Sequence, residues 1–272
     1  MIFTKRNNDC KKIFLISTGR TGTKFFATYF NQHKPFWGYH IYHEPQPNME
    51  GFCFDYHKKI YTEEKAEEIF LENRDTLIKN AKQLYFESNG NFGFLFPLLR
   101  NLYKDSYFIL IIRDPITYTR SVANRVLKTD SGNIQKYSID KYWLLKSNML
   151  PKDKYYGKWS EFDMYEKTAW TWRFRNSTYL NYVENDEKSM VVRFEDVFLD
   201  PNKPGIDQMN DFLKNTVKTR LKIKKADPLF NKKVNTNARQ IDTAFGSEYI
   251  KNSKYYKELV SDLTEKFGYT LP

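Results

Sequence analysis

Two glycines, Gly19 and Gly22, lie where an apolar run changes into a stretch with helical spacing. Residues 13–16 are all apolar and predict a buried parallel strand, and the aromatic side chains that follow are spaced as on one helix face. Glycine lets the backbone turn sharply, so N–H groups at the start of the helix can converge on one anionic group. The side chains that could add to this anion cradle are Arg20, Thr21, Thr23 and Lys24.

This turn differs from the loop G-x-x-x-x-G-K-[ST] that binds nucleoside triphosphates. Only two residues separate Gly19 from Gly22, and Lys24 follows Thr23 rather than the second glycine. The shorter turn suits a different phosphate ester. A purely structural turn is the alternative interpretation.

A second basic residue, Arg113, follows another apolar run, residues 107–112. Pro115 is well placed to open a helix, and Ser121 lies two helical turns after Arg113. Arginine offers a planar charged fork to phosphate oxygens, and the serine hydroxyl adds a neutral donor. If the two strands are neighbours in a parallel sheet, Arg113 and the glycine turn can face one crevice at its carboxyl edge. A surface ion pair with Asp114 is the alternative for Arg113.

Both stretches resemble motifs of the sulfotransferases that use 3'-phosphoadenosine 5'-phosphosulfate (PAPS). In that family a strand leads into [KR]-[ST]-G-[ST]-[TSK] and a helix, and this chain has Arg20-Thr21-Gly22-Thr23-Lys24. The family's 3'-phosphate motif, R-x-P after a strand with a Ser eight residues after the Arg, is similar to the stretch from Arg113 to Ser121. A softer likeness covers residues 190–196, followed by Asp200-Pro201, and is expected to be structural.

The resemblance implies a PAPS-dependent enzyme that moves a sulfuryl group to a hydroxyl or amine by in-line displacement. The implied ligands of the 5'-phosphosulfate are Arg20, Thr21, Gly22, Thr23 and Lys24, with Arg20 also neutralising the leaving oxygen. The implied ligands of the 3'-phosphate are Arg113 and Ser121. Phe25 stands where many family members have an aromatic beside the adenine, although it could equally be core. No copy of the family's C-terminal Arg-Lys-Gly contact is present.

An acceptor hydroxyl needs a base within hydrogen-bond reach. The first candidate is Glu44, because several carbohydrate- and tyrosine-directed sulfotransferases place a catalytic Glu at a similar distance past the loop. His43 is the rival, and Glu87 is a third possibility, because it stands where cytosolic sulfotransferases of small molecules have a His. A surface carboxylate before a proline turn is the alternative for Glu44. His40 and His43 lie three apart on a predicted strand and would point to opposite faces, so we expect no metal site.

The elements that must position these residues alternate between strand and helix. Strands are expected at residues 13–16, near 36–44, 84–88, 107–112 and 189–194, and helices after residue 24, over 62–83, 92–103, 161–183, 206–218 and 249–267. Residues 46–61 are expected to be loop. The alternation predicts an α/β fold of three layers, with a mostly parallel central sheet and helices on both faces. The resemblance implies the P-loop-like architecture of sulfotransferases.

The 272 residues are long enough for one large domain, residues 1–272, with a possible substrate lid at about 128–160. Flexible surface is the alternative for the lid. The formal charge is +11, and residues 214–233 are strongly basic, which indicates either a solvated face or attraction of an acidic ligand. No RNA-binding pattern is present, so no nucleic-acid partner is expected.

Two cysteines, Cys10 and Cys53, are expected to be reduced. With no hydrophobic signal segment and no run of 18 apolar residues, we expect a cytoplasmic enzyme with no membrane partner. Its acceptor would be a small molecule or a carbohydrate. The rival functions are a P-loop nucleotide-dependent kinase and a basic nucleic-acid-binding protein.

Overall fold

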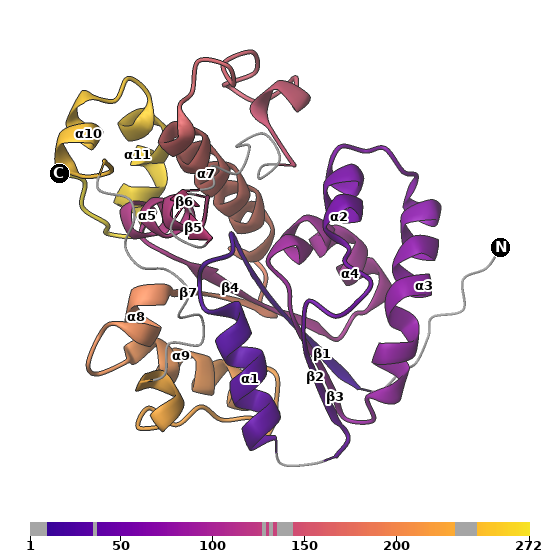
Figure 1. The fold of residues 1–272 in the computed structure, drawn as a ribbon. Coiled ribbons are helices and arrows are strands. Elements are labelled where there is room, and N and C mark those ends of the chain that lie inside the picture. Colours follow the sequence, from indigo (N-terminus) through magenta and orange to yellow (C-terminus); the bar gives the residue numbers. More distant parts are fainter. Residues whose placement is uncertain (1–9, 35–36, 127–128, 131–132, 135–143, 232–243) are drawn as a thin grey trace. The chain divides into compact units, whose positions relative to one another are not determined.

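The computed structural model describes residues 10–34, 37–126, 129–130, 133–134, 144–231 and 244–272 (Figure 1). The chain divides into two compact units. The first unit comprises residues 1–112 and 178–232, and the second comprises residues 113–177 and 233–272. The expectation of a single domain stays a prediction.

A parallel sheet forms the centre of the first unit. Its five strands lie in the order β2-β3-β1-β4-β7, and every neighbouring pair is parallel. The strands are β1 (Lys11–Ser17), β2 (Tyr39–His43), β3 (Leu84–Ser88), β4 (Ser106–Ile112) and β7 (Ser189–Arg193). Leu15 of β1 lies opposite Ser88 on one side and Ile109 on the other. The predicted parallel sheet is confirmed, and the strands before the glycine turn and before Arg113 are neighbours.

Helices cover both faces of this sheet (Figure 1). The helical segments are α1 (Thr23–His33), α2 (Glu50–His57), α3 (Glu63–Asn80), η1 (Gly90–Leu95), α4 (Phe96–Leu102), α8 (Phe194–Phe198), α9 (Pro204–Asp211), the π-helical η3 (Phe212–Thr216) and η4 (Pro228–Asn231). The chain moves from β1 to β2 in one direction across the sheet and returns to β3 and β4 in the other. Because such crossovers are right-handed, α1 lies on one face and α2, α3 and α4 on the opposite face.

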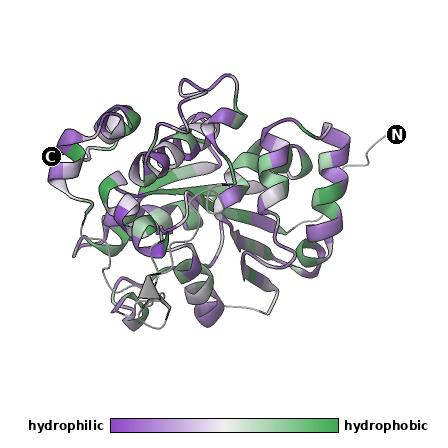
Figure 2. Cartoon of the chain, turned by 45° about the horizontal axis from the view of Figure 1, so that its top comes forward, coloured by the Kyte–Doolittle hydropathy of each residue, from purple (hydrophilic) through white to green (hydrophobic). Residues whose placement is uncertain are grey.

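The core of the first unit lies between the central strands and these helices. All residues of β4 and all but the first of β1 are buried, as expected for strands covered on both faces, and Figure 2 shows the same strands as hydrophobic. The ring of Phe14 packs against those of Phe92 and Phe108 on one face. From α1, the predicted helix face with Phe26, Tyr29 and Phe30 is fully buried.

The second unit is mainly helical. It contains α5 (Pro115–Val126), the short strands β5 (Thr129–Asp130) and β6 (Asn133–Ile134), η2 (Ser147–Met149), most of α7 (Met164–Val183), α10 (Ser247–Asn252) and α11 (Tyr256–Lys266). Trp172 is buried and its Nε1 donates to the carbonyl of Arg113 at 2.8 Å. The Tyr256 hydroxyl lies 3.0 Å from Thr119 Oγ1, which joins α11 to α5. Pro115 opens α5, as predicted.

Two sequence predictions of secondary structure are wrong. Residues 46–61 contain α2, whose Cys53, Phe54 and Tyr56 are buried, so tertiary packing stabilises a helix in a segment expected to be loop. The expected last helix is divided into α10 and α11. The break is at Ser253, whose hydroxyl donates to Glu166 and accepts from the N–H of Tyr256.

The possible lid at 128–160 falls partly on residues 127–128, 131–132 and 135–143, which lie outside the described residues. In its described part, Tyr155 and Trp159 are buried and pack against Phe162 and Trp170, so both are core residues. Leu144, Met149 and Tyr156 are exposed. No helix among the described residues is long and apolar enough to cross a bilayer.

Candidate active site

The turn between β1 and α1 has the backbone conformation of a ligand-binding loop. Gly19, Arg20 and Gly22 all have positive φ angles, of 81°, 57° and 79°. Such angles turn successive N–H groups toward one side of the chain. Gly22 also meets a second restriction, because a Cβ added there would lie 2.6 Å from the ring of Phe198. Two independent requirements therefore select glycine at this position.

The amino end of α1 leaves donors for an anion. Within the described part of the chain, the N–H groups of Thr21, Gly22, Thr23 and Lys24 have no protein acceptor. The hydroxyl of Thr21 is completely buried and has no hydrogen-bond partner among the described residues. No acidic residue is present in the first turn of α1, so the helix dipole is not already compensated. These features fit an anionic group at the start of α1.

The end of β3 supports this turn from the neighbouring strand. The N–H of Asn89 donates to the carbonyl of Leu15 at 2.9 Å, and a Cβ on Gly90 would lie 3.1 Å from the carbonyl oxygen of Ser17. Ser17 Oγ in turn accepts from the N–H of Gly19 at 3.0 Å. The turn is therefore held by contacts to its own strand and to the next.

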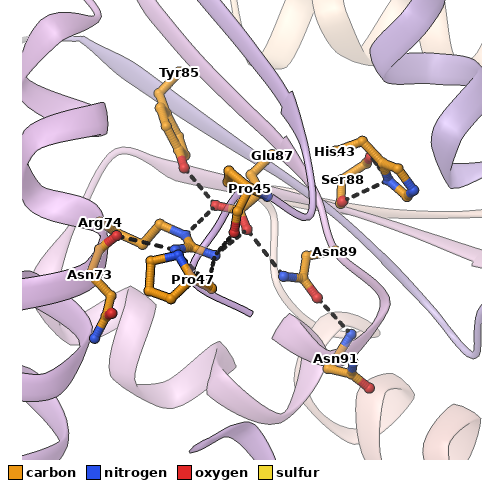
Figure 3. Close-up of polar contacts among 10 residues, drawn as sticks. All are labelled: His43, Pro45, Pro47, Asn73, Arg74, Tyr85, Glu87, Ser88, Asn89 and Asn91. Atoms are coloured by element: carbon orange, nitrogen blue, oxygen red, sulfur yellow. Dashed lines mark hydrogen bonds and ion pairs between the residues drawn. The ribbon is translucent and has the colours of Figure 1, made fainter. Parts of the chain in front are cut away.

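A buried ion pair lies beside the end of β3 (Figure 3). Glu87 and Arg74 are both fully buried, with Arg74 Nε 3.0 Å and Nη2 3.3 Å from the two carboxylate oxygens. Tyr85 and Asn89 donate to the same carboxylate at 2.5 Å and 3.1 Å. Burial raises the pKa of Glu87, and the charge of Arg74 opposes that rise. In this structure both oxygens of Glu87 are occupied by buried protein donors and its side chain is not exposed.

Arg74 also fixes the segment that follows β2. Its Nη2 donates to the carbonyl of Pro45 at 2.9 Å, and its Nη1 donates to that of Pro47 at 3.3 Å, across the cis Gln46–Pro47 bond (Figure 3). Sequence reasoning missed this residue. The available signal was its position on α3, four residues after Phe70 and four before Ile78, on the buried face. A charged residue at such a position requires a buried partner.

The two candidate bases lie at the end of β2. His43 Nδ1 is 3.2 Å from the carbonyl oxygen and 3.0 Å from the hydroxyl of Ser88, its register partner on β3 (Figure 3). The carbonyl can only accept and the hydroxyl can donate or accept, so these contacts orient the ring through Nδ1. Glu44 is exposed, has a φ of 44°, and donates its N–H to the carbonyl of Ser88 at 3.2 Å. Two strand spacings, about 10 Å, separate β2 from β1.

Phe25 belongs to a buried aromatic cluster. Its ring is 4% exposed and lies 5.1 Å from that of Phe198 and 4.7 Å from that of Phe230. The contacts of Phe25 in the structure are therefore those of a core residue.

The second basic motif lies in the second unit. Arg113 directly follows β4 and is partly exposed, with its Nε 3.1 Å from Thr117 Oγ1. The carboxylate of Asp114 accepts from the N–H of Thr117 at 2.8 Å and so caps α5. Ser121 lies on α5 and is partly exposed. The expectation that Arg113 and the glycine turn face one crevice stays a prediction.

No group of three or more potential metal ligands is found among the described His, Cys, Asp and Glu residues. His40 and His43 lie on β2, and His40 Nδ1 is 3.2 Å from the hydroxyl of Tyr42.

Two solved structures are similar to the chain over nearly its whole length. One is described as the sulfotransferase domain from the curacin biosynthetic pathway; it is 16% identical, with a TM-score of 0.51, over 97% of this chain and 99% of that chain. The other is a sulfotransferase from Alicyclobacillus acidocaldarius, 14% identical, with a TM-score of 0.51, over 96% of this chain and 97% of that chain. No family model and no curated protein sequence matches the chain. The chain thus has the sulfotransferase fold, which confirms the predicted α/β architecture.

Proposed function

We propose that this protein is a PAPS-dependent sulfotransferase. The observation that carries the proposal is the set of unpaired donors at the start of α1, which includes the buried hydroxyl of Thr21. An uncompensated buried donor costs about 1–3 kcal/mol, so a fold that keeps one at a helix amino end is expected to gain from an anionic ligand. The sulfotransferase fold supports a phosphosulfate as that ligand.

In this proposal the donor is held at both ends. The residues that bind the 5'-phosphosulfate are Arg20, Thr21, Gly22, Thr23 and Lys24, and those that bind the 3'-phosphate are Arg113 and Ser121. The donor supplies an activated sulfuryl group. The sulfur–oxygen bond to the phosphate breaks as the acceptor oxygen bonds to sulfur, and adenosine 3',5'-bisphosphate leaves. Arg20 and the N–H groups neutralise charge on the leaving oxygen, a role that is typically worth about 3 kcal/mol per donor.

The base that takes the acceptor proton is proposed among the neighbours His43 and Glu44. The contact of His43 Nδ1 with Ser88 supports His43, because it orients the imidazole ring. The resemblance ranks Glu44 first. The acceptor is proposed to be a small molecule or a carbohydrate that carries a hydroxyl or an amine, and the reaction is proposed to need no metal.

A thermal-shift titration tests donor binding. Adenosine 3',5'-bisphosphate at 100 times its dissociation constant should stabilise the protein by about 2.7 kcal/mol. Stabilisation by magnesium-ATP and not by the bisphosphate would instead favour the kinase alternative. Tight RNA binding with a steep salt dependence, and no response to the bisphosphate, would favour the nucleic-acid alternative.

Two pairs of variants assign roles. Arg20→Ala and Arg113→Ala should each weaken bisphosphate binding, with Lys65→Ala, an exposed residue of α3, as the control. His43→Gln and Glu44→Gln should leave bisphosphate binding intact. The variant that slows transfer by about 100-fold or more identifies the base. If His43 is the base, His43→Gln should also remove the acidic limb of the pH–rate profile.

A further inference from the structure

A cavity of the first unit lies at the opposite edge of the sheet from the glycine turn. Its volume is 430 Å³, and it is lined by Lys11, Tyr39, Lys82, Gln83, Leu84, Lys218, Thr219 and Arg220. Lys11, Tyr39 and Leu84 are the first residues of β1, β2 and β3, so the cavity lies at the amino ends of these strands. We call it the amino-edge pocket. The length of β1, about 20 Å, separates it from the candidate active site.

Four of the eight lining residues are cationic and none is acidic. The ammonium group of Lys11 donates to the backbone carbonyl of Lys218 at 2.5 Å. The pKa of Lys11 is lowered, first by burial and second by the positive charge of Lys218. Asp105 opposes this effect, but its carboxylate also pairs with Lys188 at 3.2 Å. Lys11 and Lys218 are therefore held close enough to repel each other, and a bound anion would relieve that repulsion.

Lys218 occupies a backbone position that normally selects glycine. Its φ is 56°, and it follows Val217, the last residue of the turn after η3. The N–H of Thr219 donates to the carbonyl of Leu213 at 2.9 Å, the contact that closes a helix end with a left-handed residue. A lysine here carries conformational strain, and strain of this kind concentrates at binding sites. Lys218 thus carries a positive charge at a left-handed position where glycine is favoured.

Neutral donors complete the amino-edge pocket. The hydroxyls of Tyr39 and Thr219 lie 3.2 Å apart, and Gln83 adds an amide. The positive field extends to the neighbouring strand. There burial, followed by the charges of Lys34 and Lys82, lowers the pKa of His40.

We propose that the amino-edge pocket binds a small molecule with two or more phosphate groups. Four cations match such a ligand, because each phosphate carries about −1.5 to −2 at neutral pH. The volume lies within the range of about 300–1,000 Å³ that is typical of small-molecule sites. This site is separate from the donor site and does not depend on the proposed transfer reaction.

Calorimetric titration of the full chain with tripolyphosphate tests this site. The variant is Lys218→Gln/Arg220→Gln. The matched control is Lys65→Gln/Lys225→Gln, which removes the same charge from two exposed residues of the first unit that pair elsewhere, with Glu68 and Asp207. The pocket variant should bind tripolyphosphate about tenfold more weakly or worse, and the control should bind like the wild type.

Arg20→Ala locates the binding. Tripolyphosphate affinity should persist in Arg20→Ala, and tripolyphosphate should protect Lys11, Lys82 and Lys218 from acetylation. The proposal is overturned if the wild type does not bind, if Arg20→Ala abolishes binding, or if the pocket and control variants weaken it equally. It is also overturned if RNA displaces tripolyphosphate and binds more tightly with a steep salt slope.

Discussion

At the carboxyl edge of the parallel sheet the donors for an anion are backbone N–H groups at the start of α1, whereas at the amino edge they are lysine and arginine side chains. The first set is positioned by the turn at Gly19–Gly22 and by the contacts of β3. The second set consists of partly or fully exposed side chains, of which Lys11 and Lys218 lie close together. Backbone donors suit a reaction that requires fixed geometry, because they need no reorganisation as charge develops. Side-chain cations suit binding that weakens as the salt concentration rises.

The two edges also differ in how their charges are supported. Arg74 and Glu87 form a fully buried pair that fixes the segment after β2, while Lys218 is exposed and rests on a strained backbone. A buried pair stabilises its surroundings only as long as both partners remain. Substitutions at the carboxyl edge should therefore cost more stability than those at the amino edge.

The largest expected effect is that of Arg74→Ala. It leaves the carboxylate of Glu87 buried without its counter-ion, which should lower the free energy of unfolding by about 3–5 kcal/mol in urea denaturation. Lys79→Ala, on the same helix, removes an exposed pair with Asp75 and should cost about 0.5 kcal/mol or less. Equal losses in the two variants would show that burial of the Arg74–Glu87 pair does not set its contribution to stability.

The next effect is a pH dependence from His57 on α2. Burial, followed by the charge of Lys59, lowers the pKa of His57 to about 4, and its ring lies 4.7 Å from that of Phe94. The unfolded chain binds the same proton near pH 6.5, so this stability is complete above pH 6.5 and is lost as the pH falls toward 4. The loss should reach about 3 kcal/mol. The measurement is the free energy of unfolding of the wild type and of His57→Gln as a function of pH. If the two free energies change with pH in parallel, His57 is not the cause of the pH dependence.

A smaller effect separates the two glycines of the turn. Gly22→Ala places an alanine in the left-handed region and against the ring of Phe198. It should lower the free energy of unfolding by about 2–3 kcal/mol and should weaken bisphosphate binding. Gly19→Ala is the matched control, because its φ is similar and nothing lies within 4 Å of the added Cβ. It should cost about 1 kcal/mol. Thermal unfolding of both variants shows whether the contact with Phe198 lowers stability further than the left-handed backbone conformation does alone.

The smallest effect has the opposite sign. Lys218→Gly relieves the left-handed conformation and should raise the free energy of unfolding by about 1 kcal/mol. The same variant should bind tripolyphosphate more weakly. A stabilised variant with unchanged binding would show that Lys218 does not contribute to the amino-edge pocket.

The sequence by itself determined the elements whose signals are local. Unbroken apolar runs predicted the central strands, and the glycine spacing predicted the turn before α1, because burial on both faces and a sharp turn each restrict residue type at consecutive positions. Pro115 likewise marked the start of α5. The two short motifs were enough to indicate the sulfotransferase fold.

Only the tertiary structure decided the contacts between residues distant in the chain. It paired Arg74 with Glu87, oriented His43 through Ser88, formed α2 in a segment expected to be loop, and brought Lys11 to Lys218. None of these has a local signature, because a charged or polar side chain looks the same in sequence whether its partner is water or a buried group. The folded chain alone sets that partner, and with it the difference between a structural carboxylate and an available base.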